Sequence, residues 1–164
     1  MKIIAMLGSP LVMVLVAAVV CGGLSWRLRR SEPVVLGGVG LGVTGLLDVT
    51  TKNAVARLRP PTELHAVTAS GFSFPSGHAI FSAVTLLLCT SLLTRRLVRG
   101  TARRVALWVV SSAMIAAIGY SRVFLGVHYP SDVLAGWCLA VAWTTALVLA
   151  FDLWTRRRQA QYER

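Results

Sequence analysis

The stretch PSGHAIFSAVTLLLCTSLLTRR, residues 75–96, decides the fold class of this chain. Its central part, residues 79–94, contains no acidic or basic side chain, and two arginines follow it directly. At about 1.5 Å per helical residue, such a run nearly crosses the ~30 Å hydrocarbon layer of a bilayer. The stretch therefore predicts a membrane-spanning helix that begins near Ser76 and ends near Thr94.

Four more runs of the same kind flank this one. They cover residues 3–26, 33–51 (with a single charged residue), 105–121 and 133–151. The helices that they predict span roughly residues 3–25, 33–58, 102–120 and 131–154, and the pair Pro60-Pro61 is expected to end the second. Five spans leave no room in 164 residues for a separate soluble domain. We therefore predict an all-α, polytopic bundle of about five transmembrane helices, with residues 1–164 as one domain.

The net charge of +11 could suggest a nucleic-acid-binding protein, but the positions of the cations argue against it. Twelve of the 17 basic residues follow the first, third or fifth apolar run, where a serpentine chain returns to the same side. This is the positive-inside pattern, so we expect these loops in the cytoplasm, against anionic lipid heads. The clusters are Arg27, Arg29 and Arg30, then Arg95, Arg96, Arg99, Arg103 and Arg104, then Arg156, Arg157, Arg158 and Arg164.

Few polar side chains interrupt the apolar runs. Asp48 lies four residues before Lys52 on the same helical face, and a carboxylate at that depth is expected to pair with this or another cation. Cys21, Cys89 and Cys138 each lie within an apolar run. We expect these cysteines to be small buried hydrophobic residues, not metal ligands or disulfide partners.

Most of the remaining polar chemistry lies in three short stretches, which the predicted topology brings to the outer face of the membrane. They are Lys52 to Arg59-Pro60, then Pro75-Ser76-Gly77-His78, and then Ser121-Arg122 to His128 and Asp132. Three fixed cations, a hydroxyl and a glycine amide at a predicted helix amino end suit a tetrahedral phosphate, whose charge must be held from several sides. The stretches therefore predict a phosphate site at the outer membrane face.

Two histidines give this site the groups for catalysis. His128 and Asp132 are four residues apart at the start of a predicted helix, so the carboxylate can orient one imidazole nitrogen and leave the other free as a nucleophile or base. His78 is placed to give a proton to a leaving oxygen. His65, the third histidine, belongs to none of the stretches and is interpreted as a loop residue.

These three stretches resemble, in residue type, order and spacing, the signature motifs of the type 2 phosphatidic acid phosphatase superfamily, and together they span residues 52–132. The resemblance implies a helical membrane bundle that hydrolyses a phosphate ester or anhydride without a metal or other cofactor. It implies that His128 attacks phosphorus to form a phosphohistidine, with support from Asp132, and that His78 protonates the leaving group. The residues implied to hold the phosphate oxygens are Lys52, Arg59, Ser76, Gly77 and Arg122. Arg57 lies outside the strict pattern and is at most auxiliary.

The number of spans differs from that of the family. Membrane members usually have six spans with both termini in the cytoplasm, whereas five spans place Met1 outside. The additional helix would precede the first motif, so this chain is either a short form or one that begins at an internal methionine.

The leading hypothesis is therefore an enzyme that hydrolyses a lipid phosphate or diphosphate monoester at the outer leaflet. Undecaprenyl diphosphate, phosphatidylglycerol phosphate and phosphatidic acid all remain possible substrates, because the motifs bind the head group. The alternative is a non-catalytic protein that binds or transports a phosphate-bearing lipid, although binding alone needs no oriented nucleophile.

A metal site built from His78, His128, Asp132 and His65 is a further hypothesis, but the nearby cations would repel a metal ion. Vanadate haloperoxidases share the constellation, but a compact membrane chain argues against that activity, and the oligomeric state is left open.

Overall fold

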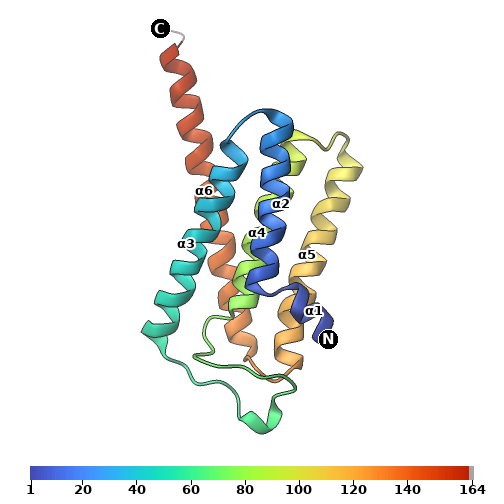
Figure 1. Cartoon of the computed structure of the whole chain (residues 1–164), viewed down its shortest axis with the longest axis vertical. Coiled ribbons are helices and arrows are strands. Elements are labelled where there is room, and N and C mark those ends of the chain that lie inside the picture. The colour runs from blue at the N-terminus through green and yellow to red at the C-terminus, as the bar shows by residue number, and fades with distance from the viewer. Residues whose placement is uncertain (163–164) are drawn as a thin grey trace.

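The computed structural model describes residues 1–162, which form a bundle of helices without a strand among them (Figure 1). In chain order the elements are α1 (Lys2–Leu7), α2 (Pro10–Leu28), α3 (Glu32–Val55), the 3-10 turn η1 (Thr62–Leu64), α4 (Gly77–Arg96), α5 (Thr101–Phe124) and α6 (Pro130–Tyr162). The all-α prediction is confirmed. Arg164, assigned above to the third arginine cluster, lies outside the described residues.

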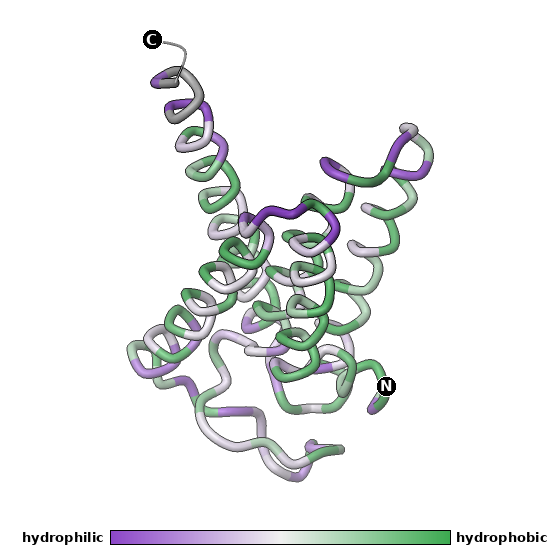
Figure 2. Tube along the Cα trace, turned by 45° about the horizontal axis from the view of Figure 1, so that its top comes forward, coloured by the Kyte–Doolittle hydropathy of each residue, from purple (hydrophilic) through white to green (hydrophobic). Residues whose placement is uncertain are grey.

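Five of these helices are long and apolar enough to cross a membrane, as the five apolar runs predicted. They are α2, α3, α4, α5 and the part of α6 from Pro130 to Arg157. Figure 2 shows apolar residues along the helices and hydrophilic residues concentrated near the turns and helix ends. Large apolar side chains such as Leu11 and Val19 face outward, where the hydrocarbon of a bilayer would cover them. The chain is therefore a multi-pass membrane protein.

Helix α4 forms the centre of the bundle and packs against α2, α3, α5 and α6. It is also the most buried of the five spans. Its apolar residues contribute to two clusters, one made of Cys21, Leu24, Leu36, Leu88 and Leu92, and the other of Ile80, Ala83, Val84 and Ala140. The Pro-Ser-Gly-His stretch therefore lies at the end of the most firmly held element.

The first predicted helix is divided in two, which the sequence analysis missed. Helix α1 ends at Leu7, and α2 begins at Pro10 after the Ser9 side chain accepts a hydrogen bond from the Val12 N–H at 3.4 Å. A serine cap followed by proline starts a helix well, because proline has no N–H to leave unpaired. Gly8 forms the corner, where a Cβ would lie 2.2 Å from the Ile118 side chain of α5.

Three other helix ends differ from the prediction. Helix α3 stops at Val55 instead of near Leu58, because Ala56 takes a left-handed conformation (φ 47°) that ends the helix before the proline pair. Helix α5 continues to Phe124, so Arg122 lies on a helix and not in a loop. Helix α6 continues past Trp154 to Tyr162. Of the three cysteines, Cys21 and Cys89 are buried as expected, whereas Cys138 is exposed on the outside of the bundle.

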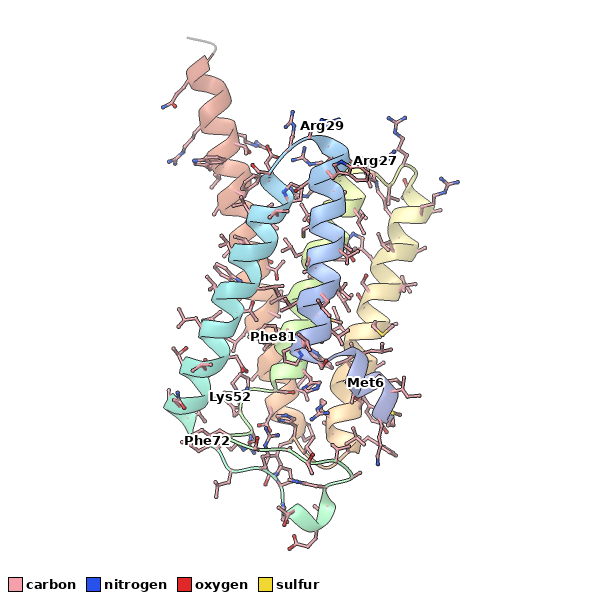
Figure 3. The ribbon with its side chains drawn as sticks, viewed as in Figure 1. Met6, Arg27, Arg29, Lys52, Phe72 and Phe81 are labelled. Atoms are coloured by element: carbon pink, nitrogen blue, oxygen red, sulfur yellow. The ribbon has the colours of Figure 1, made fainter. Side chains whose placement is uncertain are left out.

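The two ends of the bundle carry different groups. Arg27 and Arg29 lie at one end and Lys52 at the other (Figure 3). At the arginine-rich end, Arg95 of α4 forms an ion pair with Asp152 of α6 at 2.8 Å, which fixes the central helix to its neighbour. The opposite end is the place where the three motif stretches meet.

Candidate active site

Three segments far apart in the sequence meet at the end of the bundle that carries Lys52. They are the chain after α3, the start of α4 and the loop between α5 and α6. The Ser76 N–H donates to the Asp132 carbonyl at 3.0 Å, and Arg59 Nη1 donates to the Val127 carbonyl at 2.9 Å. These bonds hold the three stretches together, so the convergence expected from the topology is present in the structure.

The amino end of α4 offers unpaired donors. Ser76 precedes the first helical residue, Gly77, and both are buried. The Ser76 side chain makes no capping bond, and its Oγ and the Nε of Arg122 are buried without a hydrogen-bond partner among the described residues. Buried polar atoms are normally satisfied, and a helix amino end favours an anion. These atoms therefore mark a place where the oxygens of a ligand can complete the hydrogen bonding.

Lys52 and Asp48 form the expected pair beside this helix end. Lys52 Nζ lies 2.6 Å from Asp48 Oδ1, and both side chains are mostly shielded from solvent. A Cβ on Gly77 would lie 3.2 Å from Lys52 Nζ and 3.5 Å from the Asp48 carboxylate. The glycine thus lets the pair approach the first turn of α4.

His128 is placed by the tight connection between α5 and α6. The Val127 N–H donates to the Arg122 carbonyl at 3.3 Å, which folds the chain back over the end of α5. Gly126 makes this turn possible: its φ is 71°, and a Cβ there would lie 2.0 Å from the Leu64 carbonyl oxygen. The result is a histidine side chain that is almost fully buried at the centre of the site.

The contacts of His128 assign its tautomer. Its Nε2 lies 3.1 Å from Arg59 Nη1, and its Nδ1 lies 3.5 Å from Asp132 Oδ2. A guanidinium can only donate, so Nε2 must accept and carry a lone pair. We therefore assign the proton of the neutral ring to Nδ1, on the side of the carboxylate.

The surroundings of His128 also keep the ring neutral. Burial lowers the pKa of His128 from its ordinary 6.5 to about 3, and the nearby charges of Arg59 and Arg122 act in the same direction. The same two cations and Lys52 act electrostatically on His78, the half-buried second residue of α4. The second imidazole therefore belongs to the same cluster of charges as the first.

Asp132 is completely buried and has two close donors. Its Oδ1 accepts a hydrogen bond from Arg57 Nη1 at 2.9 Å, and its Oδ2 accepts one from the Tyr129 N–H at 2.9 Å. The distance of 3.5 Å to His128 Nδ1 is too long for a hydrogen bond, although the two groups face each other. The side chain closest to the carboxylate is therefore that of an arginine and not that of the histidine.

Arg59 organises the loop around the site. Its guanidinium donates to three carbonyl groups of that loop, at Ser70 (2.9 Å), Gly71 (3.1 Å) and Phe72 (3.3 Å). With the contacts to Val127 and His128 described above, all five of its N–H groups are directed at acceptors. A ligand oxygen that binds Arg59 has to replace or share one of these acceptors.

The structure thus gathers all eight predicted site residues and adds one that the sequence analysis set aside. Arg57, interpreted above as at most auxiliary, contacts Asp132 directly. Its position two residues before Arg59 was visible, but its partner 75 residues away in the chain was not. His65 lies in the loop as expected, where its Nε2 is 3.0 Å from the Pro60 carbonyl. Within residues 1–162 no three His, Cys, Asp or Glu side chains form a group that could hold a metal ion.

Comparisons with known proteins agree with the resemblance seen in the motifs. The model of the PAP2 superfamily matches residues 33–156. An undecaprenyl-diphosphatase of Sulfolobus acidocaldarius is 34% identical over 65% of this chain and 49% of its own length. Phosphatidylglycerophosphatase B of Bacillus subtilis is 30% identical over 82% of this chain and 65% of its own length. The chain therefore spans between about half and two thirds of these curated relatives.

One solved structure resembles the whole bundle. It is the crystal structure of a transmembrane PAP2-type phosphatidylglycerolphosphate phosphatase from Bacillus subtilis. The two structures superpose with a TM-score of 0.85 at 25% sequence identity, over 92% of this chain and 74% of the other. The helical arrangement that brings the motifs together is thus the arrangement of that membrane protein.

Proposed function

This chain belongs to the PAP2 superfamily, and on that premise we propose that it hydrolyses a phosphate or diphosphate monoester of a membrane lipid through a phosphohistidine intermediate. The observation that carries this proposal is the position of the buried His128, whose Nε2 lies 3.1 Å from Arg59 Nη1 and whose Nδ1 faces the buried carboxylate of Asp132 at 3.5 Å. A protein that only bound phosphate would need cations, but not an imidazole held between those cations and a carboxylate.

Binding comes first in the proposed mechanism. Lys52, Arg59 and Arg122 surround the phosphate oxygens, and the Ser76 hydroxyl and Gly77 N–H complete the cradle. One oxygen takes the place of His128 Nε2 as an acceptor for Arg59, which frees the lone pair next to phosphorus. The fixed cations stabilise the charge that spreads over the equatorial oxygens in the transition state, so the residues supply the charge that a metal ion would otherwise bring.

The chemical step then proceeds in two halves. His128 Nε2 forms a bond to phosphorus while the bond to the leaving oxygen breaks, and His78 gives that oxygen a proton. Asp132 stabilises the positive charge that develops on the His128 ring. In the second half, water gives a proton to His78 and attacks phosphorus, which breaks the phosphorus–nitrogen bond and releases inorganic phosphate.

We place the reaction at the outer leaflet of the membrane. Arg27 and Arg29 of the first arginine cluster lie at the end of the bundle opposite to Lys52 (Figure 3), and by the positive-inside pattern they mark the cytoplasmic end. Undecaprenyl diphosphate, phosphatidylglycerol phosphate and phosphatidic acid are all candidate substrates, because the site chemistry recognises the phosphate. The activities for which the relatives are named, undecaprenyl-diphosphatase and phosphatidylglycerophosphatase, support a substrate from this class.

The experiment measures phosphate release by the purified protein in detergent from these three lipids. His128→Ala is expected to lower kcat by a factor on the order of 10³ or more, because it removes the attacking atom. His65→Ala is the matched control, since this histidine lies in the loop outside the site. Protein denatured at alkaline pH during turnover should carry phosphate on His128, because acid would hydrolyse the phosphorus–nitrogen bond. Lipid binding without phosphate release in the wild type would favour the alternative of a non-catalytic lipid-binding or transport protein.

A further inference from the structure

Arg57 connects two parts of the site that are distant in the sequence. It lies in the segment after α3, and its Nη1 donates to Asp132 Oδ1 at 2.9 Å and to Ser131 Oγ at 2.7 Å in the first turn of α6. Its guanidinium carbon also lies 4.2 Å from the centre of the Tyr129 ring, a distance at which a cation and an aromatic face attract each other. Three residues in and just before the first turn of α6 therefore contact this one arginine.

The main chain of Arg57 is held as well as its side chain. The Ser73 N–H donates to the Arg57 carbonyl at 2.8 Å, and Ser73 is fully buried. The segment after α3 is thus fixed against the loop segment that leads into α4. A side chain that starts from a fixed point and ends in three contacts has little freedom to reach elsewhere.

Asp132 pairs directly with this arginine, whereas Arg59 acts on the carboxylate from a longer distance. Among the side chains that the structure describes, Arg57 is the one permanent cation within 4.0 Å of the completely buried carboxylate. Lys52 is occupied by Asp48, and Arg59 is directed at carbonyl groups and His128. A buried carboxylate that loses its cation is strongly unfavourable and takes up a proton or draws one onto a neighbouring base.

We propose that Arg57 is a positioning residue: it holds Asp132 so that the carboxylate faces His128 Nδ1, and it does so without touching the substrate phosphate. The proposal rests on the proposed role of His128 as the attacking group. Removal of Arg57 leaves Asp132 without its cation, and the nearest base is His128, at 3.5 Å. The ring then loses either its orientation or its free lone pair, whereas Arg59, Arg122 and Ser76 still hold the phosphate.

The first measurement does not require turnover. In protein labelled with ¹⁵N-histidine, the wild-type ring of His128 should give the signals of one neutral tautomer with its proton on Nδ1. Arg57→Ala should move these signals, because the charge facing Nδ1 is no longer balanced, and an Asp132→Asn background should remove most of that effect. Unchanged His128 signals in Arg57→Ala would overturn the proposal. If the wild type releases no phosphate at all, the proposed function fails, but this spectrum still tests the contact.

The second measurement separates positioning from substrate binding. Arg57→Ala should lower kcat roughly 10- to 100-fold, as expected for a strongly coupled neighbour, while KM and the affinity for vanadate stay within about twofold of the wild type. Arg59→Lys, which alters a phosphate-binding cation, should weaken vanadate binding clearly. A loss of vanadate affinity in Arg57→Ala equal to that in Arg59→Lys would make Arg57 a phosphate ligand and refute the positioning role.

A third variant keeps the test decisive if Arg57→Ala does not fold. Arg57→Lys retains the charge but has one compact ammonium group, so it can pair with Asp132 without reproducing the flat fork and its contact with the Tyr129 ring. We expect intermediate kcat and partly shifted His128 signals. A lysine variant with wild-type spectra but the full loss of kcat would contradict the proposal.

Discussion

Gly119 of α5 packs directly against the side chains of Val133 and Trp137 of α6, and Gly119→Ala tests whether that packing positions Asp132. A Cβ at this position would lie 2.4 Å from Trp137 Cζ2 and 2.6 Å from Val133 Cγ1. Ordinary contact begins at 3.4 Å, so the tryptophan ring has to retreat by about 1.0 Å (3.4 − 2.4). Val133 follows Asp132 directly in the first turns of α6, so the carboxylate is expected to move with it.

The magnitude follows from two opposing effects. Overpacking of this kind costs about 1–3 kcal/mol, and replacing a helical glycine by alanine returns up to ~1 kcal/mol. With overpacking in the middle of its range, at about 2 kcal/mol, and a gain of ~1 kcal/mol, the net loss is about 1 kcal/mol, which corresponds to a fall in Tm of roughly 2–4 °C for a chain of this size. A displacement of about 1 Å near reacting groups can lower kcat by on the order of 10²-fold.

The assay compares Tm in detergent and kcat for phosphate release in Gly119→Ala and in a control, Gly23→Ala. Gly23 lies inside α2, where a Cβ meets no atom within 4 Å, so alanine should leave kcat unchanged and raise Tm slightly, if at all. A Gly119→Ala protein with wild-type Tm would refute the packing argument. A lowered Tm with wild-type kcat would show that the start of α6 is not coupled to the chemistry.

Three further predictions concern pH, metal dependence and sidedness. Because the pKa of His128 is about 3 in the folded protein and ordinarily 6.5, the unfolded chain binds the proton first, so stability should fall as the pH drops from about 6.5 towards 3. The fall in Tm between about pH 7 and about pH 4.5 should therefore be smaller in His128→Gln than in the wild type. An equal fall would contradict the lowered pKa of His128. Activity should persist in excess EDTA and fall with vanadate, which resembles five-coordinate phosphorus; activity lost with chelator and restored by a divalent metal would reverse the metal-free mechanism. In a background without the native cysteines, a membrane-impermeant thiol reagent on intact cells should label Thr68→Cys and not Arg99→Cys, and the reverse pattern would place the site in the cytoplasm.

Much of this molecule can be predicted from local sequence, because the physical causes are local. An uncharged run of membrane length predicts a membrane-spanning helix. Arginines after alternate runs predict which ends of these helices face the cytoplasm. The spacing of Asp48 and Lys52 is one helical turn, so their ion pair was predictable and is present at 2.6 Å. The motif residues from Lys52 to Asp132 are likewise brought together by a serpentine topology that the runs alone define.

Other features depend on contacts between distant segments, which no local pattern encodes. Glycine is needed at position 8 because α5 brings Ile118 against it, and at position 126 because the Leu64 carbonyl group lies against it. The pairing of Asp132 was predicted from its distance to His128 in the chain, yet in the fold its closest cation is Arg57. A helix fixes neighbours four residues apart, whereas the choice among several cations for one buried carboxylate depends on which of them the packed bundle brings within reach. The sequence alone thus predicts which residues form the candidate site, and the tertiary structure decides which of them contact one another.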